Sequence, residues 1–106
     1  MKVMKGKAAK PNQYQLPETT TVSMAEARPR VRARFEGEVR RIRIQPLAAI
    51  PTLEVVLDDG TGRVAALFMG RRGIAGIECG RRLAVEGTPV AAERGLTLYN
   101  PAYELL

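Results

Sequence analysis

The stretch from residue 31 to residue 44 constrains the fold of this chain more than any other. Its apolar side chains first occupy odd positions, from Val31 to Val39, and then even positions, at Ile42 and Ile44. Alternation of this kind gives a strand one buried face, and a shift of phase by one residue is what a β-bulge produces. The sequence therefore predicts one long, bent strand of the kind that turns the corner of a small β-barrel.

Glycine and arginine mark the place of the bend. Gly37 lies just before the phase shift, and Arg40 and Arg41 stand side by side at it. A glycine within a strand permits a tight bend, and the bulge is expected to redirect the side chain of Arg40. Pro46 and Pro51 then enclose a segment of small apolar residues, which we expect to be a loop.

Four further strands are predicted from alternation and turn residues. The segment from Asp58 to Gly62 is a strong hairpin turn. Residues 70–80 are too rich in glycine for a helix and are predicted to be an irregular connector. Pro89 places the end of the fourth strand at an edge of the sheet. The five predicted strands cover residues 31–44, 52–58, 63–69, 81–90 and 96–99.

The two ends of the chain carry weaker signals. Ser23 to Glu26 has the S-x-x-E form of a capping box, and Pro29 limits any helix there to about one turn. Residues 1–22 are polar and are predicted to form a flexible basic tail, ahead of one folded domain over residues 23–106. Asn100-Pro101 breaks the last strand and leaves a short C-terminal tail.

The order of these elements is typical of one architecture. A long bent strand, a tight hairpin, a connector and two more strands match the Greek-key barrel called the OB-fold. An SH3-like barrel is the main alternative, although its strands are usually more even. We predict an all-β protein: a five-stranded Greek-key OB-fold barrel with a short N-terminal helical turn and a short irregular connector between strands three and four.

The net charge of +6 is concentrated in the first 43 residues. Four lysines lie in the tail, and seven arginines lie between residues 28 and 43 against two glutamates. Such asymmetry favours a nucleic-acid or other anionic partner. The alternative is a solubilising tail and a solvated strand face, on which Glu36 and Glu38 pair with neighbouring arginines.

Several chemistries have no residues to support them. The chain contains no histidine, which removes Ser-His-Asp triads and Cys/His zinc sites, and its one cysteine, Cys79, cannot form an internal disulfide. Asp58 and Asp59 are ordinary turn residues. No apolar run has the length of a membrane span, and none follows the first residues as in a secretory signal. We therefore expect a cytoplasmic, non-enzymatic protein without cofactor, metal, membrane or small-molecule partner.

Three motifs resemble known proteins. They are V-x-x-x-F-x-G-x-V-x-x-I from Val31, L-x-V-x-L-D-D-G-T-G-x-V from Leu53, and G-R-R-L-A-V-E-G from Gly80. Together with the stretch Leu67 to Ile77 and the ending after Tyr99, they resemble small stand-alone bacterial OB-fold proteins over residues 25–106. The resemblance implies the OB-fold and nucleic-acid binding.

Ten residues are predicted to contact nucleic acid. Alternate residues of a strand repeat about every 6.6–7 Å, close to the spacing of phosphates, and guanidinium groups bind phosphate through paired donors. The second and third strands carry only one aromatic residue, Phe68, so phosphate contacts should outweigh base stacking. We expect single-stranded or structured nucleic acid, bound with low sequence specificity. The ten residues are Arg32, Arg34, Arg40, Arg41, Arg43, Arg63, Arg71, Arg72, Arg94 and Tyr99.

Other interpretations stay open at this point. A protein-interaction module without nucleic-acid binding is favoured by the near-neutral body of the chain and by the apolar loop from Leu47 to Ile50. A lipid surface is a weaker candidate, because no amphipathic helix is predicted. Arg71 and Arg72 could simply belong to a tight connector, and Tyr99 could close one end of the barrel.

Overall fold

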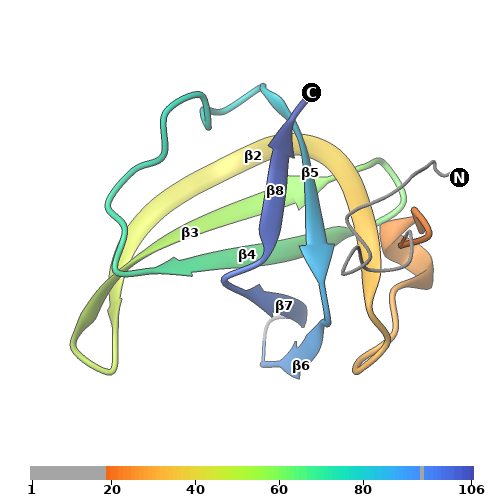
Figure 1. Ribbon diagram of the computed structural model, residues 1–106, viewed down its shortest axis with the longest axis horizontal. Helices are drawn as coiled ribbons and strands as arrows, with labels where there is room; N and C mark the ends of the chain where they lie inside the picture. The colour runs from red at the N-terminus through yellow and green to blue at the C-terminus, as the bar shows by residue number, and fades with distance from the viewer. Residues whose placement is uncertain (1–18, 94) are drawn as a thin grey trace, which may run out of the picture.

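The computed structural model describes residues 19–93 and 95–106. The secondary structure of these residues consists of β-strands and one short helical turn. The all-β prediction is therefore confirmed (Figure 1). Residues 70–81 contain no helix or strand, as expected for the irregular connector. The elements are η1 (Met24–Glu26), β2 (Ala33–Leu47), β3 (Ile50–Asp58), β4 (Arg63–Met69), β5 (Arg82–Gly87), β6 (Val90–Ala92), β7 (Gly95–Tyr99) and β8 (Ala102–Leu105).

A single sheet joins all seven strands in the order β6-β7-β4-β3-β2-β5-β8. Among these seven strands, β4 and β7 pair in parallel and the other pairs are antiparallel; an isolated parallel bridge also joins Thr21 to Arg34. The predicted fourth strand is in fact two strands, β5 and β6, which are separated by Thr88-Pro89. β5 pairs with β2 near one end of the strand order, and β6 pairs with β7 at the other end. This one segment therefore joins the two ends of the sheet, which curls on itself (Figure 1).

The bulge in the first strand is confirmed. The pairing of β2 with β3 shifts register between Val39 and Arg41, so Arg40 is the extra residue. Before the bulge, β2 pairs with β5, and its buried residues include Ala33 and Phe35. After it, β2 pairs with β3. Val31 and Ile44 depart from the prediction, because Val31 precedes the strand and both side chains are half exposed.

The segment between Pro46 and Pro51 is not the loop predicted from its prolines. Strands β2 and β3 continue to the pair Leu47–Ile50, and Pro46 lies opposite Pro51. In a two-residue hairpin the pair next to the closing pair exchanges no hydrogen bonds, so prolines there sacrifice none between the strands. Ala48 and Ala49 form the turn with φ of 51° and 66°. Left-handed backbone at alanine costs about 1–2 kcal/mol per residue, and Asn-Gly is the usual sequence for this turn.

The C-terminal tail is also a strand, which the sequence did not predict. Asn100, with φ of 50°, turns the chain, and its side-chain oxygen accepts a hydrogen bond from the Met69 amide (2.9 Å). Strand β8 then pairs with β5, where Tyr103 lies opposite Val85. Tyr103 contacts the Phe68 ring edge-to-face, with ring centroids 5.7 Å apart. Phe68 is therefore a core residue rather than part of a binding face.

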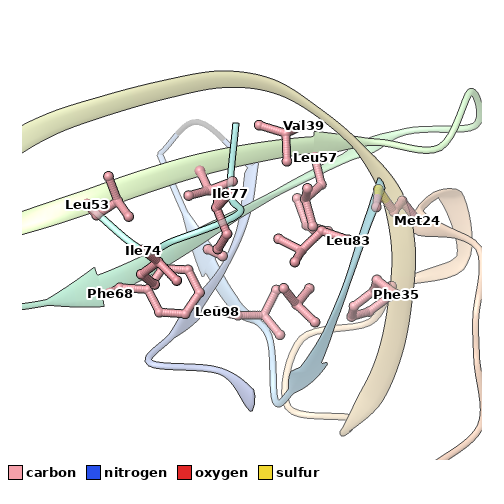
Figure 2. Close-up of a cluster of buried hydrophobic side chains, with 14 of the residues drawn as sticks. Met24, Phe35, Val39, Leu53, Leu57, Phe68, Ile74, Ile77, Leu83 and Leu98 are labelled. Carbon is pink, nitrogen blue, oxygen red and sulfur yellow. The ribbon is translucent and has the colours of Figure 1, made fainter. Parts of the chain in front are cut away.

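The core is almost entirely aliphatic (Figure 2). Phe35, Leu57, Leu83 and Leu98 are fully buried between the two sides of the curled sheet. The connector adds two buried isoleucines, Ile74 and Ile77, which pack into the core (Figure 2). These contacts explain why a glycine-rich segment without helix or strand is nevertheless held in place.

Asp59, in the β3–β4 turn, anchors the helical turn in place of the predicted capping box. Ser23 makes no side-chain cap bond, and the Met24 amide donates to Asp59 Oδ2 (2.9 Å). Asp59 Oδ1 accepts bonds from the Thr61 hydroxyl (2.6 Å) and from the amides of Thr61 and Gly62. Burial raises the pKa of Asp59, but these bonds outweigh it and hold the pKa at about 2.

We expect Asp59→Asn to lower the free energy of unfolding at neutral pH by about 1–2 kcal/mol, because hydrogen bonds to a charged acceptor are lost. The folded pKa of about 2 lies below the ordinary value of 3.8, so this stabilisation is complete above pH 3.8 and disappears as the pH falls towards 2. Urea unfolding at pH 7 and pH 2 measures it, with Glu93→Gln as an exposed control. An equal difference at both pH values would contradict the assignment.

Candidate nucleic-acid interface

Past the bulge, the residues of β2 that point away from the core continue in register onto β3, β4 and β7. Two rows of paired residues cross these four strands. The first row is Arg41, Val56, Ala65 and Thr97, and the second row is Arg43, Glu54, Leu67 and Tyr99. The pair Asp58–Arg63 lies beside the first row. We call these ten residues the outer face.

Two acids hold the three arginines of the outer face. Glu54 Oε1 accepts from Arg43 Nε at 2.9 Å and lies 3.9 Å from Arg41 Nη2. Asp58 accepts from Arg63 Nε at 2.8 Å. The amide of Gly60, and then Arg63, hold the pKa of Asp58 below its usual value. The guanidinium groups stay largely exposed, whereas Glu54 is mostly covered. The acids therefore orient the arginines and leave one net positive charge.

The middle of the outer face is apolar. Half-buried Val56 and Ala65 and buried Leu67 lie between the arginines and Tyr99, a residue that is 47% exposed. A hollow of about 180 Å³ opens here beside Arg41 and Arg63. Positive charge around an apolar strip is the arrangement that a nucleotide chain requires, because phosphates flank flat apolar bases.

Arg34, in β2 ahead of the bulge, and Arg32, just before the strand begins, lie away from this face. Arg32 pairs with Glu86 at 3.2 Å, and Arg34 pairs with Glu104 at 2.8 Å and Glu36 at 3.2 Å. The bond to Glu104 is the main reason that the pKa of Arg34 is raised. The bulge thus divides the predicted arginine stripe into an ion-paired half and a half on the outer face. Of the two partners expected from the sequence, Glu36 pairs with Arg34 and Glu38 lies 3.9 Å from Arg40.

Residues 19–22, which the sequence assigns to the tail, lie beside this ion-paired half. The Val22 amide donates to the carbonyl of Arg34 (2.9 Å), and the Arg34 amide donates to that of Thr20 (3.1 Å). The Thr19 hydroxyl donates to Glu86 (2.6 Å), which is the first cause of the lowered pKa of Glu86. The remaining tail, residues 1–18, and Arg94 lie outside the described residues.

Arg71 and Arg72 begin the connector, close to the β2–β3 hairpin. The Gly70 amide donates to the carbonyl of Pro51 (2.7 Å), and the two arginines that follow are exposed. Within residues 19–93 and 95–106, neither has a carboxylate oxygen within 4.0 Å. They add unneutralised positive charge near one end of the outer face.

Sequence reasoning missed the residues that complete the outer face. Only the strand register places Glu54 and Leu67 on the outer face, because Glu54 lies opposite Arg43 and Leu67 lies opposite Tyr99. The alternation of β3 was the available signal, because Glu54 and Val56 stand opposite in phase to its buried apolar residues, Leu53, Val55 and Leu57. No three His, Cys, Asp or Glu residues gather as a metal site in the described part of the chain. No helix there is long and apolar enough to cross a membrane.

Comparison with known proteins shows a shared fold without a shared sequence. No protein-family model and no curated protein matches the chain. The structure is similar to the second OB-fold domain of replication protein A from Methanococcus maripaludis, with a TM-score of 0.66 and 14% identity over 82% of this chain and 95% of that one. It is similar to a replication factor A related protein from Methanobacterium thermoautotrophicum, with a TM-score of 0.68 and 14% identity over 87% and 96% of the two chains.

A third similar structure is a chain of the Stn1–Ten1 complex of S. pombe. Its TM-score is 0.56 at 16% identity, over 71% of this chain and 57% of that one. The chain therefore has an OB-fold, as predicted. These similar proteins come from two archaea and a yeast, so they give no support to the bacterial group that the motifs resemble.

Proposed function

We propose that this protein is a non-catalytic nucleic-acid-binding module that holds single-stranded or structured DNA or RNA mainly by its phosphate backbone. The observation that carries the proposal is the outer face, where Arg41, Arg43 and Arg63 surround an apolar strip that ends at exposed Tyr99. The similar structures from replication proteins support the proposal through their fold alone. We also propose a cytoplasmic location.

The contacts follow from the side chains available. Arginine forks bind phosphate oxygens at any sequence, and Tyr99 is the one aromatic side chain of the outer face on which a base can stack. Sequence specificity should therefore be low. We assign the main contacts to the outer face and rim contacts to Arg40, Arg71 and Arg72, while Arg94 stays a candidate from the sequence alone. Arg32 and Arg34, held by three carboxylates, have the smaller share.

A salt titration tests the proposal. Fluorescence anisotropy with single-stranded DNA, single-stranded RNA and duplex should show log K falling linearly with log salt. For three to five phosphate contacts on a single strand, the slope is expected to lie between roughly −2 and −3.5. Homopolymers and mixed sequences should bind within a few-fold of one another. Affinity that ignores salt, or no binding at low salt, would contradict the proposal.

A second candidate function, a protein-interaction module, is favoured by the free edge of β8. Among residues 19–93 and 95–106 this strand is the last of the sheet. The amide of Leu106 donates towards β5, so the amides of Tyr103 and Leu105 point away from β5. Exposed strand edges accept partner strands. One similar structure is itself part of a two-protein complex. A stoichiometric protein partner, without any oligonucleotide shift, would select this function.

A further inference from the structure

The β2–β3 hairpin extends beyond the rest of the sheet. Strand β4 ends at Met69, opposite Thr52, so the last two pairs of the hairpin lie on β2 and β3 alone. Figure 1 shows the hairpin as a yellow-green finger that projects at the lower left. We call residues 46–51, Pro-Leu-Ala-Ala-Ile-Pro, the hairpin tip.

The hairpin tip is apolar throughout and continues the outer face. Outward residues alternate along β2 from Arg41 through Arg43 and Gln45 to Leu47, and Leu47 pairs with Ile50. Ile50 is 41% exposed, and Leu47 is half-buried. On the same side of the ribbon, the arginines of the outer face are therefore followed by the uncharged polar pair Gln45–Thr52 and then by the apolar pair at the tip.

The two residues of the turn at the end of the tip are less favourable for hairpin stability than the usual Asn-Gly pair. Ala48 and Ala49 both have left-handed backbone, with φ of 51° and 66°, where asparagine and glycine fit without strain. Backbone held in such a region at exposed residues is an observation from which a functional hypothesis can start. With two alanines in the turn, the end of the hairpin is small and uncharged.

Positive charge borders the tip on both sides. On the β2 side, three arginines and no acid lie between Val39 and Leu53, and Glu54, the next residue, pairs with Arg43 and so offsets one of these charges. On the other side, Gly70 donates its amide to the Pro51 carbonyl and is followed by Arg71 and Arg72, which have no carboxylate partner among the described residues. An apolar contact flanked by cations is complementary to a base flanked by phosphates.

We propose that the hairpin tip stacks on the terminal base pair of a duplex at the point where it opens into a single strand on the outer face. This inference rests on the proposed nucleic-acid binding. Apolar side chains such as leucine, isoleucine and proline are the ones that proteins place against base steps. Along an intact duplex the flat faces of the base pairs are covered by stacking on one another. At a junction the face of the last base pair is exposed, next to the phosphates of the single strand. The preferred ligand is therefore a junction between double-stranded and single-stranded nucleic acid.

The test compares three fluorescent probes, each as DNA and as RNA: a duplex with a single-stranded arm, the arm alone, and the blunt duplex. Wild-type protein should bind the junction about tenfold more tightly than the arm, as burial of the tip implies. Leu47→Thr/Ile50→Thr should remove this preference and leave affinity for the arm unchanged. The matched control, Val31→Thr/Val90→Thr, removes two exposed valines from outside the face and should behave like the wild type.

A second pair of variants separates the chemistry of the tip from the stability of the hairpin. Ala48→Asn/Ala49→Gly should raise the melting temperature and keep the preference for the junction, because Leu47 and Ile50 remain. When Leu47→Thr/Ile50→Thr is added to the Ala48→Asn/Ala49→Gly variant, the preference for the junction over the arm should still be lost.

The outcomes are distinguishable. Equal binding of junction and arm by the wild type, or an unchanged preference in the tip variant, overturns the inference but not the proposed function, and leaves the tip available to a protein partner. Failure of every probe to bind the wild-type protein overturns both.

Discussion

Arg41→Gln/Arg43→Gln is expected to weaken binding of single strands about 25-fold at about 0.1 M salt, because two phosphate contacts are lost at about 0.7 logarithmic units each. The slope of log K against log salt should become shallower by about 1.4. All base sequences should be affected alike, since the lost contacts are to the backbone. Anisotropy titrations at several salt concentrations measure both quantities. Glutamine still offers donors to Glu54, so the fold should be retained.

The matched control is Arg32→Gln/Arg34→Gln. It removes the same charge, but from the stretch ahead of the bulge, where carboxylates already hold both guanidinium groups. We expect its affinity to stay within about threefold of the wild type, mostly from the change in long-range field. If the two double variants lose equal affinity, net charge alone drives binding, and the outer face is not the site.

Local signals in the sequence predicted the bulge and the hairpin turn correctly. The phase shift at Arg40 lies within one strand, so it can be read without knowing the partner. The turn at Asp59 uses residues whose side chains bond to the backbone two or three residues further along. Both features depend on neighbours in the chain, and the OB-fold follows from their order.

Features that depend on distant partners could not be predicted. Strand β8 forms because Tyr103 covers Phe68 and pairs opposite Val85, and four residues of tail carry little signal on their own. The arginine stripe looked uniform because Glu104, which holds Arg34, lies 70 residues away in the chain. The proline-bounded segment was misread because register, rather than composition, decides whether a proline interrupts a ladder.

Gly37 shows how closely β2 must approach β3 next to the bulge. A Cβ at this position would lie 2.8 Å from Met24 Cε, 2.9 Å from the carbonyl oxygen of Asp58 and 3.1 Å from its carbonyl carbon. The methionine side chain can rotate away, but the backbone of Asp58 is fixed by pairing with Glu38 on one side and Arg63 on the other. No side chain larger than hydrogen fits without separating the two strands.

Gly37→Ala is therefore expected to reduce the free energy of unfolding by about 2–3 kcal/mol, as overpacking against backbone does. For a domain of this size the melting temperature should fall by roughly 10–20 °C. Gly73→Ala is the matched control, because nothing lies within 4 Å of its added Cβ and its φ is not left-handed. Thermal melts of both variants measure the difference. If the melting temperature of Gly37→Ala equals that of the wild type, β2 and β3 are not in close contact here, and the bend would need another cause. If it melts early as expected, the close contact is what holds the strand in its bend, and with it the position of Arg41 and Arg43 beyond the bulge.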